Sequence, residues 1–206
     1  MKSRKSPRKP QYYVMELGLD ADVGPDTDGT YPLVRCLARW DRSTRSGTWV
    51  PAWTTEFQPG DWIVFRIFDY TAGAKKTTFD PKIFEIHFID RHQFHQLRSP
   101  FSSTDPTANN PIVIDSKSFS GPDGARSAAT GSRLGWICSD GGDQKISPFF
   151  PGELAYRFSK DKLQRFLFRI LIEVVCATDQ GTYELRIYDH DPEIFVGEGD
   201  PPPHRG

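Results

Sequence analysis

An alternation of apolar and polar residues constrains the fold of this chain most, and it is clearest between Lys82 and Asp90 (KIFEIHFID). Phe84, Ile86 and Phe88 fall on one side of an extended segment, while a glutamate and a histidine fall on the other. Side chains of a β-strand point alternately to its two faces, so a period of two is typical of a strand with one buried face. The pattern predicts a β-sheet that covers an apolar core.

Similar strand-like runs recur along the chain, separated by turn residues. They lie at residues 12–19, 33–41, 48–53, 61–70 and 183–189. The chain also holds 17 glycines and 17 prolines, which suits a fold with many turns and loops. Residues 99–142 are rich in Ser, Gly, Pro and Asp, and we expect long loops there, with short strands at two apolar islands, residues 111–114 and 134–138.

Residues 162–176 fit two patterns. One set of apolar residues (163, 166, 167, 170, 171, 174 and 175) fits a helical face, whereas every second residue from 166 to 176 is also apolar. Aromatic and β-branched residues are abundant here, which favours a strand. We predict that this segment forms a hairpin with residues 183–189 around a turn at residues 178–181, and a helix remains the alternative.

These runs together predict an all-β, single-domain antiparallel β-sandwich with a long central loop region, over residues 11–198. A chain of 206 residues is long enough to bury a sizeable core. We expect a disordered basic tail at residues 1–10, because MKSRKSPRKP has five basic residues, no acid and no apolar periodicity. A Pro-rich C-terminal tail is expected at residues 199–206.

Charge and hydropathy narrow the classes of partner, and the cysteine content indicates the cellular compartment. The net charge is −1, so nothing global favours nucleic acid, and we expect none, although the basic tail suits an anionic surface. No segment approaches the ~20 apolar residues of a membrane helix, and no membrane is expected. The three cysteines lack CxxC spacing and are interpreted as reduced thiols of a cytoplasmic protein.

Four of the five tryptophans lie close together in the sequence, at Trp40, Trp49, Trp53 and Trp62. Trp62 sits in the most apolar run and is expected in the core. The others stand near arginines such as Arg42, and exposed indole rings beside guanidinium groups stack on sugars or bases. We therefore predict a binding surface that includes Trp40, Arg42, Trp49 and Trp53.

Residues 57–65 (FQPGDWIVF) contain Pro-Gly at the centre of a turn, followed by an apolar run. This is similar to the turn and strand that open a central strand in cupredoxin-like sandwiches, and the resemblance implies a sandwich. It implies no copper site, because blue copper needs a Cys, two His and usually a Met. The only methionines are Met1 and Met15, and no histidine follows Cys138 or Cys176 closely.

Two clusters have residue types that bind metals. His87, His92 and His95 carry imidazoles suited to zinc. Asp189, Asp191 and Glu193 alternate, and their carboxylates suit calcium. We interpret the histidines as surface residues and the acids as protection of an edge strand against aggregation, so no metal or cofactor is predicted.

The sequence is best explained by a non-enzymatic binding or assembly module that presents an aromatic surface to a partner protein or ligand. A lectin-like sandwich that binds carbohydrate or calcium is one alternative, and self-association is another form of partner binding. A hydrolase that uses Cys138 and a distant histidine is the last alternative. The chain contains no G-x4-G-K-[ST] segment, which excludes a nucleotide P-loop.

Overall fold

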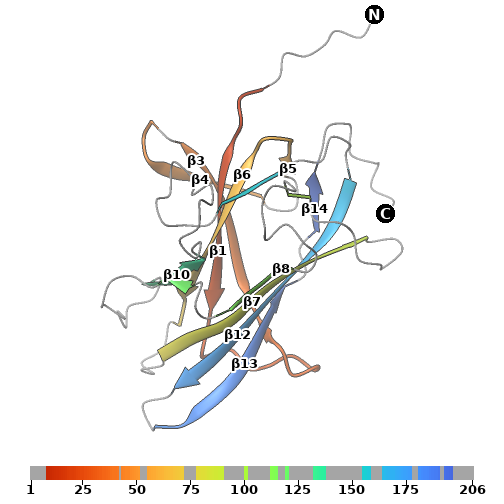
Figure 1. Cartoon of the computed structure of the whole chain (residues 1–206). Helices are drawn as coiled ribbons and strands as arrows, with labels where there is room; N and C mark the ends of the chain where they lie inside the picture. The colour runs from red at the N-terminus through yellow and green to blue at the C-terminus, as the bar shows by residue number, and fades with distance from the viewer. Residues whose placement is uncertain are drawn as a thin grey trace, which may run out of the picture.

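Among the residues that it describes, the computed structural model places fourteen β-strands in two sheets that pack face to face (Figure 1). It describes residues 8–41, 43–51, 55–71, 78–90, 100–101, 112–115, 119–120, 132–137, 155–158, 164–177, 181–190 and 193–196. These residues contain no helix. The predicted all-β sandwich is therefore confirmed.

The first sheet, sheet A, has the order β4-β3-β1-β6-β10-β9, and β11 also pairs with β6. Its strands are β1 (Tyr12–Leu19), β3 (Val34–Asp41), β4 (Ser46–Val50), β6 (Trp62–Asp69), β9 (Phe119–Ser120), β10 (Ser132–Ile137) and β11 (Ala155–Arg157). β1 is antiparallel to β3 and parallel to β6. The parallel pair brings Tyr12 beside Trp62, although fifty positions separate them in the sequence.

The second sheet, sheet B, is built around one long strand, β12 (Gln164–Ala177). β13 (Tyr183–His190) and β14 (Glu193–Val196) share one side of β12, and β7 (Thr78–Asp90) covers the other. The sheet is completed by β2 (Tyr31–Pro32), β5 (Glu56–Phe57) and β8 (Ile112–Asp115). β12 and β13 are antiparallel, so the predicted hairpin is confirmed and the helical alternative is wrong.

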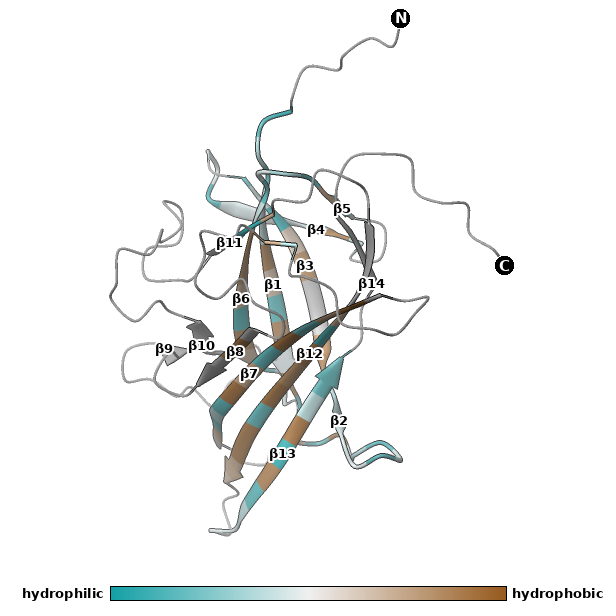
Figure 2. Cartoon of the chain, turned by 45° about the vertical axis from the view of Figure 1, so that its right-hand side comes forward, coloured by the Kyte–Doolittle hydropathy of each residue, from teal (hydrophilic) through white to brown (hydrophobic). Residues whose placement is uncertain are grey.

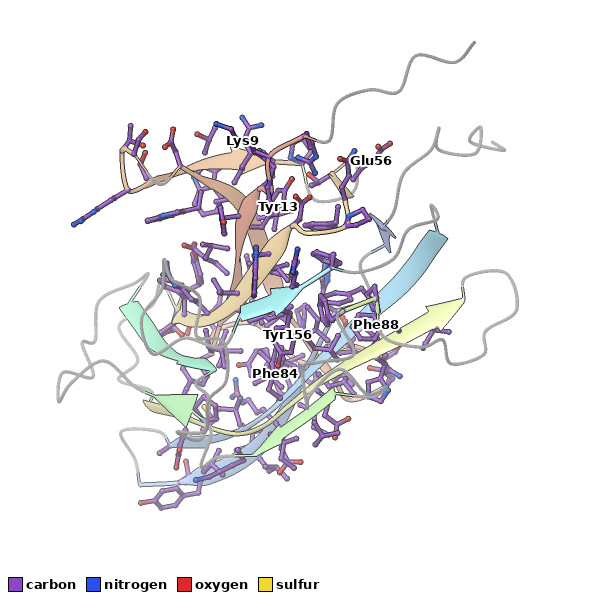
Figure 3. All side chains as sticks on the ribbon, turned by 45° about the horizontal axis from the view of Figure 1, so that its top comes forward. Lys9, Tyr13, Glu56, Phe84, Phe88 and Tyr156 are labelled. Atoms are coloured by element: carbon purple, nitrogen blue, oxygen red, sulfur yellow. The ribbon has the colours of Figure 1, made fainter. Side chains whose placement is uncertain are left out.

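The core lies between the two sheets and consists largely of aromatic and aliphatic side chains. Phe84, Ile86 and Phe88 of β7 are buried, as are Phe168, Ile170, Ile172, Val174 and Cys176 of β12. The ring of Phe65 in sheet A lies 5.4 Å from that of Phe84 and 5.9 Å from that of Phe168. Figure 3 shows Phe84, Phe88 and Tyr156 directed into this space from opposite sheets. Alternation in β7 and β12 thus places their apolar residues as the sequence predicts.

A turn at residues 58–61 introduces β6, as its Pro-Gly centre predicts. The backbone N–H of Asp61 donates to the carbonyl of Gln58 at 3.0 Å. Gly60 has φ of +93°, a conformation that costs little only without a Cβ. The carboxylate of Asp61 is buried and accepts hydrogen bonds from the backbone N–H groups of Gln11 (2.8 Å) and Gln58 (2.9 Å). The turn therefore also fixes the chain that enters β1.

The start of the chain contacts this turn through Arg8. Its guanidinium pairs with the Asp61 carboxylate, and its Nε donates to the side-chain carbonyl of Gln58. Residues 1–10 were expected to be a disordered basic tail, and residues 1–7 lie outside the described part of the chain. For Arg8 the expectation is corrected, because a buried carboxylate attracts the nearest cation.

The Asp-Pro pairs at residues 80–81 and 191–192 are each expected to place a turn before an edge strand, because proline cannot donate to a β-ladder. The structure corrects both expectations. Asp80–Pro81 lies inside β7 and does not precede an edge strand. Pro81 pairs with Val174 where the register of β12 against β7 shifts, and a bulge tolerates a residue without an N–H. The segment after the second Asp-Pro, β14, was expected at an edge, but it lies between β12 and β5.

Candidate functional site

Three aromatic residues form a row across the outer face of sheet A. Tyr12 of β1 is directly opposite Trp40 of β3 and directly opposite Trp62 of β6. Neighbouring strands lie about 4.7–4.9 Å apart, so the backbone positions of the row span roughly 10 Å. We call this surface, centred on Tyr12, Trp40 and Trp62, the aromatic face.

The alternation along β1 decides which side chains reach the aromatic face. Tyr13, Met15 and Leu17 are buried against sheet B, so Tyr12 and Val14 point outward. Val14 is nevertheless 2% exposed, because the neighbouring tryptophans cover it. The aromatic face is thus a thin second apolar layer on the solvent side of sheet A.

Trp62 belongs to this second layer, and its expected place in the core is corrected. It is half-buried and, together with Trp40, packs against the buried pair Val14 and Val64. The main core between the sheets contains neither tryptophan. The register of β6 beside β1 puts Trp62 outside, because it must lie on the same side as Tyr12.

Two arginines contact the indole rings. The Cζ atom of Arg66 lies 5.9 Å from the centre of the Trp40 ring, and the Cζ atom of Arg157 lies 5.9 Å from that of Trp62. A guanidinium at this distance is attracted by the ring quadrupole, and the attraction restrains both side chains. Arg157 is exposed, so its charge is also accessible to a ligand at that end of the row.

The aromatic face continues toward the other end of β1 through Tyr70. The Tyr70 hydroxyl donates to the Glu16 carboxylate at 3.2 Å, and burial raises the pKa of that carboxyl. The Tyr70 ring lies directly over Gly18, where an added Cβ would stand 2.3 Å from its Cδ2 atom. Glycine at this position is therefore required for the ring to reach the sheet surface.

A shallow depression of about 630 Å³ opens beside Tyr12 and Trp40. Polar residues also line it: Lys9, Gln11, Arg39, Asp41, Ser43 and Thr48. The backbone N–H and hydroxyl of Ser43 donate to Oδ1 of Asp41, both at 2.7 Å, and these bonds hold the pKa of Asp41 below its ordinary value. The depression thus holds an ionised acceptor, but alternation along β3 places this acceptor on the other side of the strand from the Trp40 ring.

The structure brings two of the four predicted binding residues together. Trp40 is in the row, and Trp49 of β4 is opposite Ala38 on the same face and 60% exposed. Trp53 and Arg42 lie outside the described residues. Tyr12, Arg66 and Arg157 were not predicted. Their place depends on strand pairings that no local pattern in the sequence specifies.

The alternative sites receive no support from the described residues. In that part of the chain no three His, Cys, Asp or Glu side chains are grouped to hold a metal ion. His87 bonds to Glu85 at 2.9 Å, while His92 and His95 lie outside the described part. The Asp189 carboxylate accepts from Nη2 of Arg169 at 2.6 Å.

The remaining residues of the alternative calcium site, and the cysteine of the alternative hydrolase site, have no described side chain. Asp191 and Cys138 lie outside the described residues, and only the backbone of Glu193 is described. Cys176 is a free, buried thiol, and burial raises its pKa, which makes it a poor nucleophile.

No family model, characterised protein or solved structure matches this chain. Among the described residues, no helix is long and apolar enough to cross a membrane.

Proposed function

We propose that this chain is a non-enzymatic binding module that holds its ligand on the aromatic face of sheet A. The observation that carries the proposal is the row of Trp40, Tyr12 and Trp62 across three neighbouring strands. A sheet needs no such rings on its solvent side to fold, since polar residues commonly fill that face. Aromatic and arginine side chains are the groups that contribute most to recognition surfaces.

A saccharide is the ligand that we propose first. The flat apolar face of a sugar ring fits against an indole or phenol ring, and its hydroxyl groups need donors and acceptors at the edge. The aromatic face offers such groups in the Arg66 and Arg157 guanidinium groups, which contact the indole rings, and in the Glu16 carboxylate, which lies on the same side of β1 as Tyr12. A protein partner that covers the whole row, with Trp49 at its border, is the second candidate, because Trp49 is 60% exposed.

Titration of the intrinsic tryptophan fluorescence tests the saccharide proposal. The probes are cellohexaose, chitohexaose and, as a charged comparison, an oligothymidylate. Stacking of one base on an aromatic side chain is worth about 1–3 kcal/mol, and a sugar ring that stacks similarly would lose roughly 5- to 150-fold in affinity on Trp40→Ala. Val113→Ala is the control, because Val113 is an exposed apolar residue of sheet B and lies outside the aromatic face.

Binding of a hexasaccharide that Trp40→Ala weakens and Val113→Ala does not would support the proposal. Binding of the oligothymidylate but of neither hexasaccharide would support the aromatic face as the binding site, with a nucleic acid as the ligand in place of a saccharide. A saccharide affinity unchanged by Trp40→Ala would place the site elsewhere, and no binding of either hexasaccharide would leave the protein partner as the better candidate.

A further inference from the structure

The outer edge of β13 is largely unpaired in the described part of the chain. β12 pairs with β13 from His190 to Tyr183, but on the other side β2 pairs only with Tyr188 and Asp189. No other described strand reaches Tyr183–Ile187. Figure 2 shows this end of β13 projecting beyond β2. An open edge of this kind is a template for pairing with another strand.

The same strand carries an exposed apolar stripe. Tyr183, Leu185 and Ile187 are 78%, 59% and 42% exposed, and all three share one face of the strand. They are three of the seven large apolar residues that are exposed in the described part of the chain. Natural edge strands are commonly protected by lysine, proline or a bulge, and Tyr183–Ile187 contains no lysine or proline. An open edge with an apolar face is a surface suited to association.

The direction of the backbone groups at this edge follows from the contact with β2. The N–H of Leu33 donates to the carbonyl of Asp189 at 3.2 Å, so the polar backbone groups of Asp189 point away from β12. These groups alternate in direction along a strand. Those of Ile187, Leu185 and Tyr183 therefore also point to the open edge.

We propose that a second copy of this chain pairs with this edge, with the two β13 strands antiparallel about a twofold axis at Leu185. Leu185 then faces Leu185 of the second copy, and Tyr183 faces its Ile187. By symmetry Ile187 faces Tyr183 of the second copy, and each of the three residue pairs exchanges two backbone hydrogen bonds, about six in all. The apolar stripes of both copies meet side by side, and sheet B continues through the dimer.

The charges on the strand select this register. With the axis at Leu185, Glu184 is opposite Arg186 of the second copy, and Arg186 is opposite its Glu184. Moving the axis to position 184 or 186 would place like charges opposite each other, which is destabilising. Within one copy, Nε of Arg186 donates to the Glu184 carboxylate at 2.9 Å and the Tyr31 hydroxyl donates to it at 2.8 Å, so both charges are held in place beside the open edge.

The interface does not rest on the proposed function, because it uses sheet B and leaves the aromatic face of sheet A uncovered. A twofold pairing of identical edges is closed, so it gives a dimer and no filament. The dimer would present two aromatic faces, and a ligand with repeated units would bind both with increased avidity.

Sedimentation velocity of the full chain at increasing micromolar concentrations tests the proposal. We expect a reversible monomer–dimer equilibrium in the wild type. Leu185→Lys should raise the dimer dissociation constant at least about tenfold, because it sets two lysines against each other on the axis. Val113→Lys is the control, since Val113 is 55% exposed on β8, at the opposite edge of sheet B from β13. This change should leave the dimer dissociation constant unchanged.

Reversal of the charge at position 184 or 186 tests which residues of the two β13 strands face each other. Glu184→Lys and Arg186→Glu should each weaken self-association, because each sets like charges opposite one another in the homodimer. Mixing the two variants should restore dimers, because opposite charges then face each other at both positions. A wild type that stays monomeric, a dimer that survives Leu185→Lys, or a mixture of folded variants that remains monomeric would overturn the proposal.

Discussion

Replacement of Asp61 by alanine should destabilise the fold far more than removal of its ionic partner Arg8. The Asp61 side chain is 1% exposed and joins the turn before β6 to the start of β1. Its carboxylate accepts the backbone N–H groups of Gln11 and Gln58 at 2.8 and 2.9 Å. Asp61→Ala leaves both donors without their acceptor in a partly buried place.

The magnitude follows from these two donors. An unsatisfied buried donor costs about 1–3 kcal/mol, so two cost about 2–6 kcal/mol. Part of this loss is offset, because burial raises the pKa of Asp61 and its charge is itself costly to bury. We expect a net loss of about 2–4 kcal/mol in the free energy of unfolding. Arg8→Ala removes a side chain that is 37% exposed, keeps both backbone hydrogen bonds and should cost about 1 kcal/mol or less.

Urea unfolding measures these differences, provided that the slope with denaturant stays constant among the variants. In thermal unfolding a chain of this size loses about 2–4 °C per kcal/mol. Asp80→Ala is the control, because Asp80 forms an exposed ion pair with Lys82 and should change stability by about 0.5 kcal/mol or less. A loss below about 1 kcal/mol for Asp61→Ala, or an equal loss for Arg8→Ala, would refute the reasoning.

Three further predictions concern the packing of the two sheets and the pH dependence of the stability. Gly18→Ala should cost about 1–3 kcal/mol by displacing the Tyr70 ring, and adding Tyr70→Ala should recover part of that loss in the same unfolding assay. Phe168→Ala should cost about 3–5 kcal/mol, whereas Trp49→Ala should stay within about 0.5 kcal/mol; comparable losses would contradict the assigned burial. The raised pKa of Asp61 means that the folded state binds its proton more tightly, so this contribution to stability is present in acid and is lost as pH rises from 3.8 through the raised value. Unfolding at several pH values should show that Asp61→Asn lacks this loss.

Much of the strand content was predictable from the sequence, because alternation is a local property. Phe84, Ile86 and Phe88 are buried as their spacing predicts, and the period of two from 166 to 176 correctly outweighed a helical pattern. Gly60 takes positive φ in the predicted turn. Each of these results depends on residues within one short segment, where backbone geometry fixes the relation of side chain to face.

The candidate site was only partly predictable, because it is formed by segments that lie far apart in the sequence. Trp40 and Trp49 stood out as residue types, but nothing near them in the sequence indicates Tyr12, Arg66 or Arg157. The parallel pairing of β1 with β6 and the pairing of β11 with β6 put these residues on one surface. Pairings between distant segments depend on the packing of the whole sandwich.

β13 shows most clearly what the sequence determined and what the tertiary structure decided. Alternation predicts that Tyr183, Leu185 and Ile187 share a face, and they do. An apolar face of this kind would ordinarily be buried, yet it is exposed, and the opposite face buries Tyr188. Pairing with β12 sets Tyr188 opposite the buried Ile172, so register decides the outcome. A period of two defines two faces, but only the sheet that packs against the strand determines which of them is inside.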